Sequence, residues 1–550
     1  MPEPEGASST PISAATQATR WWLDAVGYEV YIRSFADTSA SGIGDLGGVT
    51  AHLDHLADLG IGIVWITPFY RSPMADYGYD VADYRAVDPL FGDLDDLDEL
   101  LDQAHRRDLR VVLDLVPNHC SSEHPWFAEA VAEPDGNRRD YFIWRDPAPD
   151  GGPPNNWVGY FGGPAWTLDE QSGQYYLHLF LPSQPDLNWR NPDVHDEFDN
   201  ILRFWLERGV DGFRIDVAQA LVKDAALRSN PQIAPWDPKG SRWEQWDAFE
   251  HRYDIGQPET LDIFHRWRTI TEAYDAVLIG ETYVLEPDRL AEMIRGDGLH
   301  VGFWFKPMHV EWSPDQLRAV IAEPLETIAD PRTIGWVASS HDEMRPPSRF
   351  GGAEVGRRRS MALSTVLLCL PGVPFLYQGE ELGLVDGIVA ESQRADPVGD
   401  DVSLSRDGCR TPMPWGPGPA MGFSDSTETW LPMGDRSEAD TMAWQRKTPG
   451  SWLDRYRRLI SLRRDEKELR HGAFEWCETA SSDVIAFRRG ALYVALNAGP
   501  AAVALDVGGE ICFDSLDLAA AGTNVLALEL RADQAVVVRV DGPSISATGS

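Results

Sequence analysis

Eight short apolar runs, each expected to be a strand, alternate with helix-like segments along most of this chain. The runs cover residues 27–37, 61–70, 110–119, 212–218, 276–283, 299–306, 334–342 and 374–381. Between them, apolar residues recur at helical spacing, as in Leu97, Leu100, Leu101 and Ala104. Strands separated by helices form parallel sheets, and eight such units close into a barrel. The sequence therefore predicts an α/β fold, a (β/α)8 TIM barrel formed by residues 21–119 and 185–470.

Two connections are too long for ordinary loops between a strand and a helix. Residues 120–184 are rich in Pro, Gly, Trp and Tyr and contain a strand-like segment, which predicts a small domain inserted after the third strand. The stretch that follows Glu381 is rich in Gly and Pro to about Trp430, and we expect it to fold over the carboxyl ends of the strands. From residue 471 to 550, short alternating segments without helical partners predict a C-terminal antiparallel β-sandwich.

The balance of charge excludes several classes of partner. The 550 residues include 48 Lys and Arg against 87 Asp and Glu, a net charge of −39 that repels nucleic acids and anionic lipids. Residues 1–20 are rich in Pro, Ser, Ala and Thr and predict a disordered leader rather than a signal peptide. No apolar run is long enough for a membrane span. The five cysteines are widely spaced and indicate reduced thiols. We expect a soluble cytoplasmic protein whose oligomeric state the sequence leaves open.

Polar residues end several of the predicted strands, where the catalytic groups of such barrels lie. They are Asp114, Asn118, His119, Arg214, Asp216, Glu281, His341 and Asp342. A single Asp after a strand is more often a helix cap, but the set predicts acidic groups around one pocket. Such groups suit acetal hydrolysis, which needs an anion for the anomeric carbon and a proton for the leaving oxygen. A glycine-rich phosphate loop, a nicotinamide fingerprint and a nucleophile elbow are all absent from the sequence.

Four motifs carry a resemblance to a known family. DLVPNH, GFRIDVA, IGET and SSHD occur in the order and spacing of the signature regions of the α-amylase superfamily, glycoside hydrolase family 13. The segments DYGYDVADY, QPDLN, GVPFLYQGEE and SRDGCRTPMPW further resemble its exo-acting α-glucosidase and oligo-1,6-glucosidase branch. The resemblance implies a TIM barrel enzyme that cleaves α-glucosides with retention of configuration.

Three acidic residues match the catalytic positions of that family. The resemblance implies that Asp216 is the nucleophile, Glu281 the general acid/base, and Asp342 the residue that holds the 2-OH and 3-OH of the sugar. Arg214 lies two residues before Asp216 on the same face of a strand, so its charge can keep the nucleophile ionised. Glu281 should carry a raised pKa, and a retaining mechanism requires roughly 5 to 5.5 Å between the two carboxyls.

Further residues match substrate-binding positions. His119 and His341 resemble donors to glucose hydroxyls, and Tyr79 resembles the aromatic platform beneath the ring, although a structural role is as common for each histidine. Asp80 and Arg410 resemble the pair that binds the terminal 4-OH and closes the pocket, with a surface salt bridge as the alternative and Arg406 as the second candidate. Phe161, Phe180 and Gln184 come from the inserted segment and either wall the pocket or belong to its core.

The sequence departs from the family pattern in its first loop. Where many relatives have a calcium-type loop, this chain reads DTSASGIGD, which retains Asp37 and Asp45 but has Ser39 and Ser41 at two ligand positions. No cofactor is therefore required, and a Ca²⁺ or Mg²⁺ ion at Asp37 and Asp45 is only weakly supported. Val217 resembles the residue of relatives that prefer α-1,6 bonds, but one side chain does not decide the linkage.

These features favour an exo-acting retaining α-glucosidase that hydrolyses short α-glucosides of the maltose or isomaltose type and can transfer glucose to sugars or alcohols. The alternative within the superfamily is a sucrose or trehalose isomerase or glucosyltransferase, although no RLDRD-like segment follows Asp342. A catalytically silent relative would lack Asp216 or Glu281 and carry a membrane anchor. A starch-binding module would show Trp pairs on the terminal sandwich, where Trp476 is the one Trp.

Overall fold

A computed structural model describes residues 20–283, 286–397 and 405–540. The predicted leader lies outside these ranges except for Arg20, and so does the last part of the predicted sandwich domain. The predicted Gly- and Pro-rich stretch after Glu381 is described except for residues 398–404.

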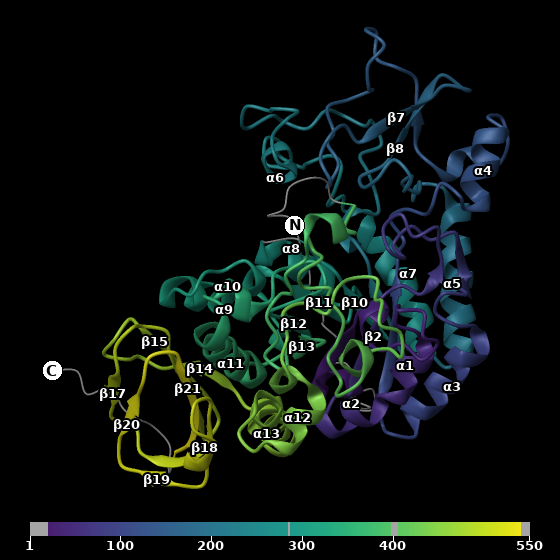
Figure 1. Cartoon of the computed structure of the whole chain (residues 1–550). Helices are drawn as coiled ribbons and strands as arrows, with labels where there is room; N and C mark the ends of the chain where they lie inside the picture. Colours follow the sequence, from purple (N-terminus) through teal and green to yellow (C-terminus); the bar gives the residue numbers. More distant parts are fainter. Residues whose placement is uncertain (1–19, 284–285, 398–404, 541–550) are drawn as a thin grey trace, which may run out of the picture.

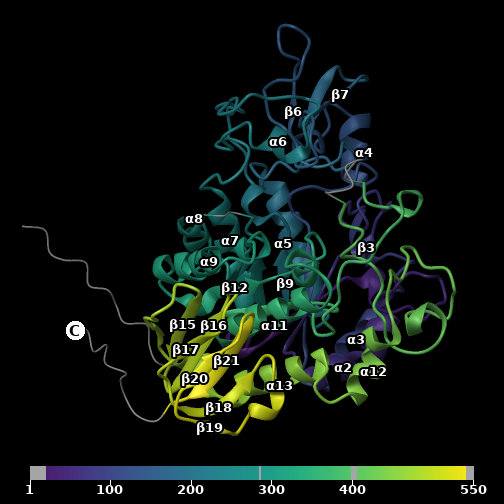
Figure 2. The same ribbon diagram turned by 60° about the vertical axis from the view of Figure 1, so that its left-hand side comes forward.

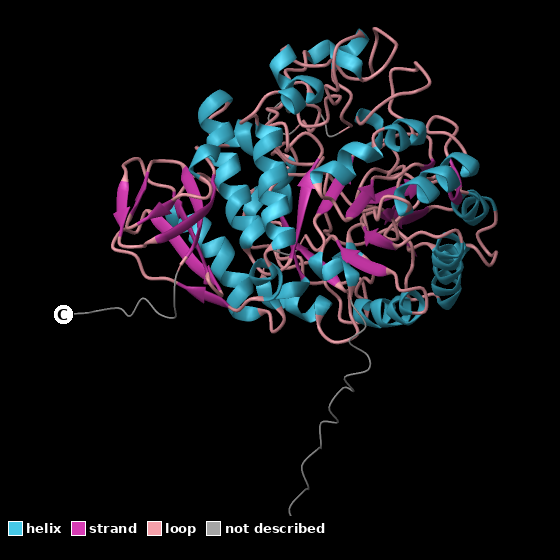
Figure 3. Cartoon of the chain, turned by 90° about the horizontal axis from the view of Figure 1, so that it is seen from below, coloured by secondary structure: helices cyan, strands magenta, loops and turns pink. Residues whose placement is uncertain are grey.

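The predicted barrel is confirmed. Eight parallel strands close in the order β1-β13-β12-β11-β10-β9-β5-β2, and each lies within or overlaps one of the predicted runs. Figures 1 and 3 show strands in the interior with helices around them. They are β1 (Gly27–Val30), β2 (Ile63–Ile66), β5 (Arg110–Leu115), β9 (Gly212–Ile215), β10 (Val277–Gly280), β11 (Val301–Trp304), β12 (Ile334–Val337) and β13 (Val373–Tyr377). Because all eight strands are parallel, their carboxyl ends meet on one face of the barrel.

Buried apolar side chains on both faces of the strands account for this closure. Inside the barrel, Trp65, Ile279, Phe303 and Phe375 belong to one core cluster, whereas alternate strand residues pack outward against the helices. The longer surrounding helices are α2 (Leu53–Leu59), α3 (Leu94–His105), α5 (Pro192–Glu207), α7 (Thr260–Glu272), α8 (Pro287–Ile294), α9 (Pro314–Thr327), α11 (Ala353–Cys369) and α13 (Trp452–Asp465). Shorter helices are α1 (Leu46–Ala51), α10 (Pro346–Arg349), α12 (Met442–Lys447) and α14 (Lys467–His471).

Helix α3 shows how local sequence sets these elements. Asp93 caps its first turn, and Asp96 returns a bond to the Asp93 backbone, so two otherwise unsatisfied amide groups are hydrogen-bonded. The residues at helical spacing, Leu97, Leu100, Leu101 and Ala104, are buried as predicted. The apolar stripe therefore holds α3 against the barrel wall.

A cap of loops and short elements covers the carboxyl ends of the strands (Figure 2). The predicted insertion supplies α4 (Pro125–Ala132) and a small antiparallel sheet of β6 (Trp144–Arg145), β7 (Trp166–Asp169) and β8 (Gln174–Leu177). A second segment, which contains Leu227, α6 (Arg242–Trp246) and Ile255, also belongs to this cap, although the sequence analysis placed it in the barrel. Helix α6 lies beside the insertion, and Leu227 and Ile255 share a core cluster with Trp157 of the insertion. The cap is therefore larger than the predicted insertion.

The C-terminal domain is an antiparallel sandwich, as predicted. Its larger sheet contains β14 (Phe474–Trp476), β15 (Val484–Arg489), β16 (Leu492–Asn497), β21 (Gln534–Arg539), β18 (Gly509–Asp514) and β19 (Asn524–Val525). Strands β17 (Val503–Leu505) and β20 (Leu528–Leu530) form the smaller sheet, and apolar side chains fill the space between the two. The other face of the large sheet packs against α11. A further two-stranded sheet, β3 (Tyr70–Arg71) with β4 (Asp83–Val87), lies beside the barrel.

None of the helices in the described ranges combines the length and the apolar character that crossing a membrane requires.

Candidate active site

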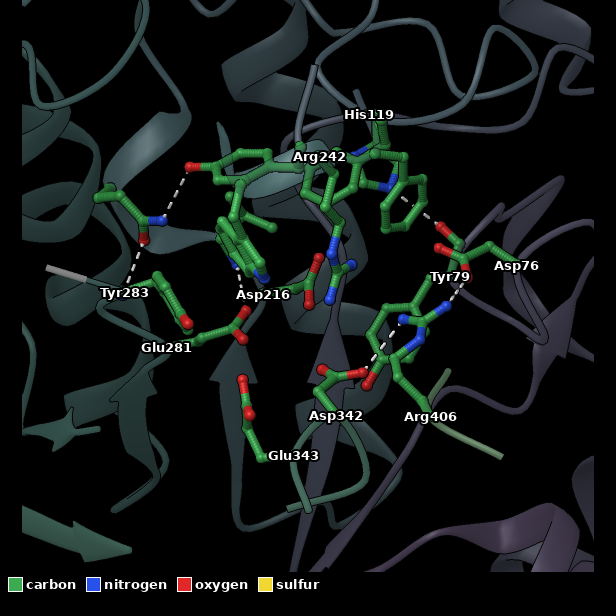
Figure 4. Close-up of a pocket in the computed structure, with 16 residues that line it drawn as sticks. Asp76, Tyr79, His119, Asp216, Arg242, Glu281, Tyr283, Asp342, Glu343 and Arg406 are labelled. Atoms are coloured by element: carbon green, nitrogen blue, oxygen red, sulfur yellow. Dashed lines mark hydrogen bonds and ion pairs between the residues drawn. The ribbon is translucent and has the colours of Figure 1, made fainter. Parts of the chain in front are cut away.

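A pocket opens between the carboxyl ends of the strands and the cap (Figure 4). Its volume is about 110 Å³. The lining residues include seven that the sequence analysis selected: Tyr79, His119, Phe161, Phe180, Asp216, Glu281 and Asp342. The strand ends supply the carboxylates, and the cap supplies the aromatic walls.

One buried arginine organises the acidic residues at the floor of the pocket. Nη1 of Arg214 lies 2.6 Å from Oδ1 of Asp216 and 2.9 Å from Oδ1 of Asp114, and Nη2 lies 2.9 Å from Oε1 of Glu281. Asp114 and Arg214 are directly paired in the register of β5 and β9, while Asp216 follows β9 and Glu281 follows β10. Parallel strand pairing thus brings three carboxyls to a single guanidinium.

This sharing affects the ionisation of the carboxyls. Burial and the neighbouring Glu281 carboxylate raise the pKa of Asp216, and Arg214 opposes the shift only in part. Burial likewise raises the pKa of Asp114 to about 6. The charge of Arg214 does lower the pKa of Asp216, as the sequence analysis expected, but burial outweighs it, since one positive charge is divided among three acids. The group is expected to bind a proton at a pH where an exposed aspartate would not.

The residue after Asp216 adopts an unusual backbone conformation. Val217 has φ 46° and ψ 43°, in the left-handed region that a β-branched side chain rarely enters. In this conformation its N–H donates a 2.8 Å hydrogen bond to Oε2 of Glu281. Both oxygens of Glu281 are therefore held, one by Val217 and one by Arg214. The strained backbone of Val217 thus helps to orient Glu281, a catalytic candidate. Strained backbone conformations of this kind cluster at functional sites.

Asp342 lies in a different electrostatic environment from Asp216. Its Oδ1 is 2.7 Å from Arg410 and 3.1 Å from Arg406. Burial alone would raise the pKa of Asp342, but His341 and the two arginines outweigh it and lower the pKa below its ordinary value. Asp342 is therefore ionised throughout the neutral range, while its side chain remains 37% exposed to the pocket.

The expected pairing of Asp80 with Arg410 was wrong. Asp80 accepts hydrogen bonds from the Ser72 hydroxyl and from the backbone N–H groups of Ala75 and Asp76, so it shapes its own loop. The ion pair at the pocket wall joins Asp76 to Arg406 instead, with 3.2 Å between Oδ1 and Nη2. Arg406 was the second candidate for this place. Asp80 and Arg410 lie behind the pocket lining, and Arg410 supports Asp342.

Tyr79 and His341 form a stacked wall beside Asp342. Their rings are 5.5 Å apart and nearly parallel, and Tyr31 stacks at 5.4 Å on the same imidazole. The Tyr79 hydroxyl lies 2.9 Å from Nε2 of His341, and Glu29 on β1 bonds Nδ1. Tyr79 faces the pocket, whereas His341 lies behind it. His341 therefore positions Tyr79 and Asp342 rather than lining the cavity.

On the cap side, His119 lines the pocket and its ring contacts Phe180 at 4.8 Å. Burial lowers the pKa of His119 to about 4, so the imidazole is neutral at pH 7. Gln184 is fully buried and bonds both Asp76 and His119, which places it behind the wall. Phe161 packs against the guanidinium of Arg406 at 5.5 Å.

Several lining residues were missed by the sequence analysis. They are Asp76, Tyr160, Gln219, Arg242, Trp243, Tyr283 and Glu343. Asp76 begins the DYGYDVADY motif already selected, and Glu343 directly follows Asp342, so proximity to a motif could have indicated both. Arg242 and Trp243 come from α6, in the part of the cap assigned to the barrel, and no local pattern distinguishes them. Burial raises the pKa of Glu343 to about 7.

The first loop does not fit a metal ion. The Asp37 carboxylate accepts hydrogen bonds from the N–H groups of Ser39 and Gly42 and from the Ser424 hydroxyl. Asp45 accepts from Thr38 and from Gly48, and so caps helix α1. Both carboxylates thus already accept hydrogen bonds from donors of the protein, with which a cation would have to compete. Within the described ranges, no group of three or more His, Cys, Asp or Glu side chains is placed to hold an ion.

We therefore expect excess EDTA to leave the unfolding temperature within about 1 °C of its value in buffer, because the Asp37 and Asp45 carboxylates are already hydrogen-bonded by donors of the protein. The measurement is differential scanning calorimetry of dialysed protein with and without the chelator. A fall of several degrees that added Ca²⁺ or Mg²⁺ reverses would contradict this prediction and return Asp37 and Asp45 to a metal site.

Comparisons with known proteins agree with this geometry. The family model described as the catalytic domain of α-amylase matches residues 29–472. This chain belongs to the α-amylase family. Among family members, it is 40% identical over 475 residues to a probable alpha-glucosidase of Rhizobium meliloti, covering 84% of this chain and 86% of that protein. It is 34% identical to an oligo-1,6-glucosidase of Halalkalibacterium halodurans, covering 86% and 88% of the two chains.

The fold of an α-amylase family enzyme also matches in three dimensions. The solved structure of the alpha-glucosyl transfer enzyme XgtA superposes with a TM-score of 0.87 at 37% identity, covering 95% of this chain and all of that one. The predicted family and its α-glucosidase and oligo-1,6-glucosidase branch are thereby confirmed.

Proposed function

We propose that this protein is a retaining exo-acting α-glucosidase, which removes the non-reducing terminal glucose from short α-glucosides of the maltose or isomaltose type. One observation carries the proposal: Asp216 and Glu281 share the Arg214 guanidinium at the floor of a pocket walled by the Asp76–Arg406 ion pair. Relatives named alpha-glucosidase and oligo-1,6-glucosidase support the substrate class.

The first chemical step uses the two shared carboxyls. Glu281 transfers its proton to the glycosidic oxygen as the bond from that oxygen to the anomeric carbon breaks, and an Asp216 oxygen forms a bond to the same carbon. The aglycone leaves as a neutral alcohol, and glucose remains as an ester of Asp216. The positive charge that develops on the sugar is stabilised by Asp216, and the Val217 N–H with Arg214 orients Glu281 for the transfer.

The second step reverses the roles. Glu281, now a carboxylate, accepts a proton from water, whose oxygen attacks the anomeric carbon and releases Asp216. Two displacements on opposite faces restore the α configuration. A sugar or alcohol in place of water gives transfer instead of hydrolysis, so both outcomes share one intermediate. In the alternative function, an isomerase or glucosyltransferase, a sugar rather than water attacks the intermediate at this step. Because the chain is similar to the alpha-glucosyl transfer enzyme XgtA, the test of the proposal also distinguishes this alternative.

The wall of the pocket explains exo action. Asp342 and Tyr79 line the pocket, and in this proposal they contact the ring hydroxyls and the apolar face of one glucose. Beyond them, Asp76 and Arg406 form an ion pair between two buried side chains, which blocks a longer chain from extending past the terminal sugar. An enclosed subsite of this kind admits one terminal residue at a time.

The proposal is tested by incubating purified protein with maltose, isomaltose, sucrose and trehalose separately, following products by chromatography and the first-formed anomer by proton NMR. Free α-glucose from maltose or isomaltose is the expected result, and the faster of the two gives the linkage preference. New disaccharides without free glucose would transfer the assignment to the isomerase or transferase alternative. Initial release of β-glucose would exclude the retaining mechanism.

Arg406→Ala should strongly weaken catalysis, since it leaves Asp76 buried without its cation and removes a contact to Asp342. We expect kcat/KM for maltose to fall by about 10²-fold or more, as is typical when one member of a buried charge pair is truncated. Steady-state kinetics measure this change. Arg464→Ala, at a position 64% exposed, serves as the matched control and should retain wild-type activity. Equal activity of the two variants would contradict a pocket role for Arg406.

A further inference from the structure

A second cavity lies between the barrel and the C-terminal domain. Figures 1 and 2 show this domain on the side of the barrel away from the cap. The volume of the cavity is about 750 Å³. Helix α11 forms one wall, the segment from α12 into α13 forms another, and residues Ser515, Leu516 and Arg531 of the sandwich domain form the third. We refer to this cavity as the junction groove.

The lining of the junction groove is rich in basic residues, whereas the chain as a whole is acidic. Its lining contains four arginines, Arg357, Arg358, Arg455 and Arg531, against two carboxylates, Glu354 and Asp440. The whole chain has the opposite balance, with 87 acidic and 48 basic residues. Clustered like charges repel, so such a group is unfavourable unless something compensates it. Because the chain as a whole is rich in carboxylates, the shortage of carboxylates in the groove lining is a local feature of this site.

Nearby carboxylates compensate only part of this positive charge. Arg357 is paired, with 2.6 Å from its Nη2 to Oδ1 of Asp440. Arg358 lies 3.6 Å from Asp533, but that carboxylate also binds Arg359 at 2.9 Å. One carboxylate thus serves two guanidiniums, and Arg358 retains an uncompensated share of its charge.

The other two arginines form no ion pair within the described part of the chain. Arg455 donates one hydrogen bond to the Ser515 carbonyl. Burial lowers the pKa of this arginine, although the charges of Asp514, Asp454 and Glu354 act in the opposite direction. These carboxylates therefore offset the loss of water only in part. Arg531 is exposed, and its guanidinium contacts only the Gln534 side chain. Donor groups of three arginines therefore remain available to an anion that enters the groove.

Two tryptophans add a flat apolar surface to the same groove. Trp444 is 39% exposed, and Trp452 lies beneath the Arg455 guanidinium at 5.5 Å. Trp452 is also the first residue of α13, so this ring lies where the helix begins at the groove. A ring that carries a phosphate could contact both kinds of surface at once.

We propose that the junction groove is a second ligand site, which binds a sugar phosphate: the phosphate on Arg358, Arg455 and Arg531, and the ring against Trp444 or Trp452. This inference does not depend on the proposed glucosidase activity. Because the groove is formed by both the barrel and the sandwich domain, a bound ligand stabilises their junction and raises the unfolding temperature.

The test is thermal unfolding of the full chain with glucose 6-phosphate, inorganic phosphate or sodium chloride, all at one ionic strength. Excess glucose is present in every sample, so that the catalytic pocket is equally occupied throughout. We expect glucose 6-phosphate to raise the unfolding temperature by about 2 °C or more at saturation, and inorganic phosphate to raise it less. Chloride should have no effect. An equal shift with chloride, or no shift with either phosphate, would overturn the proposal.

Substitutions in the junction groove test whether the rise in unfolding temperature comes from binding at this site. Arg455→Gln combined with Arg531→Gln should abolish the shift, whereas the exposed Arg464→Gln control should retain it. If the double variant unfolds, Arg531→Gln alone is used, since this side chain is exposed and, among the described residues, donates a hydrogen bond to Gln534. The single change should weaken glucose 6-phosphate binding about 10-fold. Wild-type affinity in these variants would show that the phosphate binds elsewhere and refute the site. Turnover of an aryl α-glucoside, followed in parallel, should be unchanged in all three.

Discussion

Asp216→Asn is expected to lower kcat for an aryl α-glucoside by about 10⁴-fold or more, the scale found when a covalent nucleophile is removed. The asparagine amide has nearly the shape of the carboxylate but cannot form the glucosyl ester on which both displacements depend. The loss should appear in kcat with little change in the binding of substrate, because the substitution leaves Tyr79 and Asp342 in the lining of the pocket. Steady-state kinetics with wild type and variant provide the measurement.

A matched readout separates loss of chemistry from loss of fold. The Asp216 carboxyl competes with Asp114 and Glu281 for Arg214, so removal of its charge should leave the unfolding temperature unchanged or slightly higher. Asp216→Gly should accept azide in the vacated space and convert an activated α-glucosyl fluoride to β-glucosyl azide, since the anion attacks from the Asp216 face. If wild-type turnover is no faster than that of Asp216→Asn, the catalytic assignment fails.

Glu281→Gln should produce a loss that depends on the leaving group. Proton donation contributes about 10² to 10⁴-fold when the departing oxygen is strongly basic, as in a disaccharide. A dinitrophenol needs no proton to depart, so its release in the first step should fall far less. We therefore expect kcat/KM for maltose to fall by at least about 10²-fold more than kcat/KM for dinitrophenyl α-glucoside. The ratio of the two losses is the quantity to measure.

Glu343 supplies the control for this experiment. It lines the same pocket and carries a carboxyl whose pKa burial raises to about 7, but it lacks the contacts to Arg214 and to the Val217 N–H that hold Glu281. Glu343→Gln should lower kcat/KM for maltose and kcat/KM for dinitrophenyl α-glucoside by similar factors. A leaving-group dependence in Glu343→Gln, and none in Glu281→Gln, would reverse the assignment of the acid.

The acidic candidates could be selected from the order of residues along the chain because barrel geometry makes their positions predictable. Each strand is a run of buried apolar residues that the local pattern reveals, and parallel strands bring all carboxyl ends to one face. Asp216 and Glu281 follow β9 and β10 and Asp342 lies beyond β12, so strand order alone places them together. Their shared contact with Arg214 depends on the register of paired strands and is visible only in three dimensions.

The ion pair at the pocket wall shows where sequence reasoning failed. Asp76 and Asp80 stand four residues apart in one loop, as do Arg406 and Arg410 in another. The intervening turn, with Tyr77 at φ 51° and Gly78 at φ 114°, directs Asp76 to the pocket and Asp80 back into the loop. Such a choice depends on how two loops more than 300 residues apart meet, and nothing in either motif specifies it.

The strands, the barrel, the sandwich and the residues at the strand ends all follow from the amino-acid sequence, since the spacing of apolar side chains and parallel pairing specify them. The composition of the cap, the pairing of Asp76 with Arg406, the donors that occupy Asp37 and Asp45, and the raised pKa of Asp216 follow from the folded arrangement instead. Those features arise from burial and from contacts between distant segments. Charge–charge energies and desolvation depend on three-dimensional distance, which local pattern does not record.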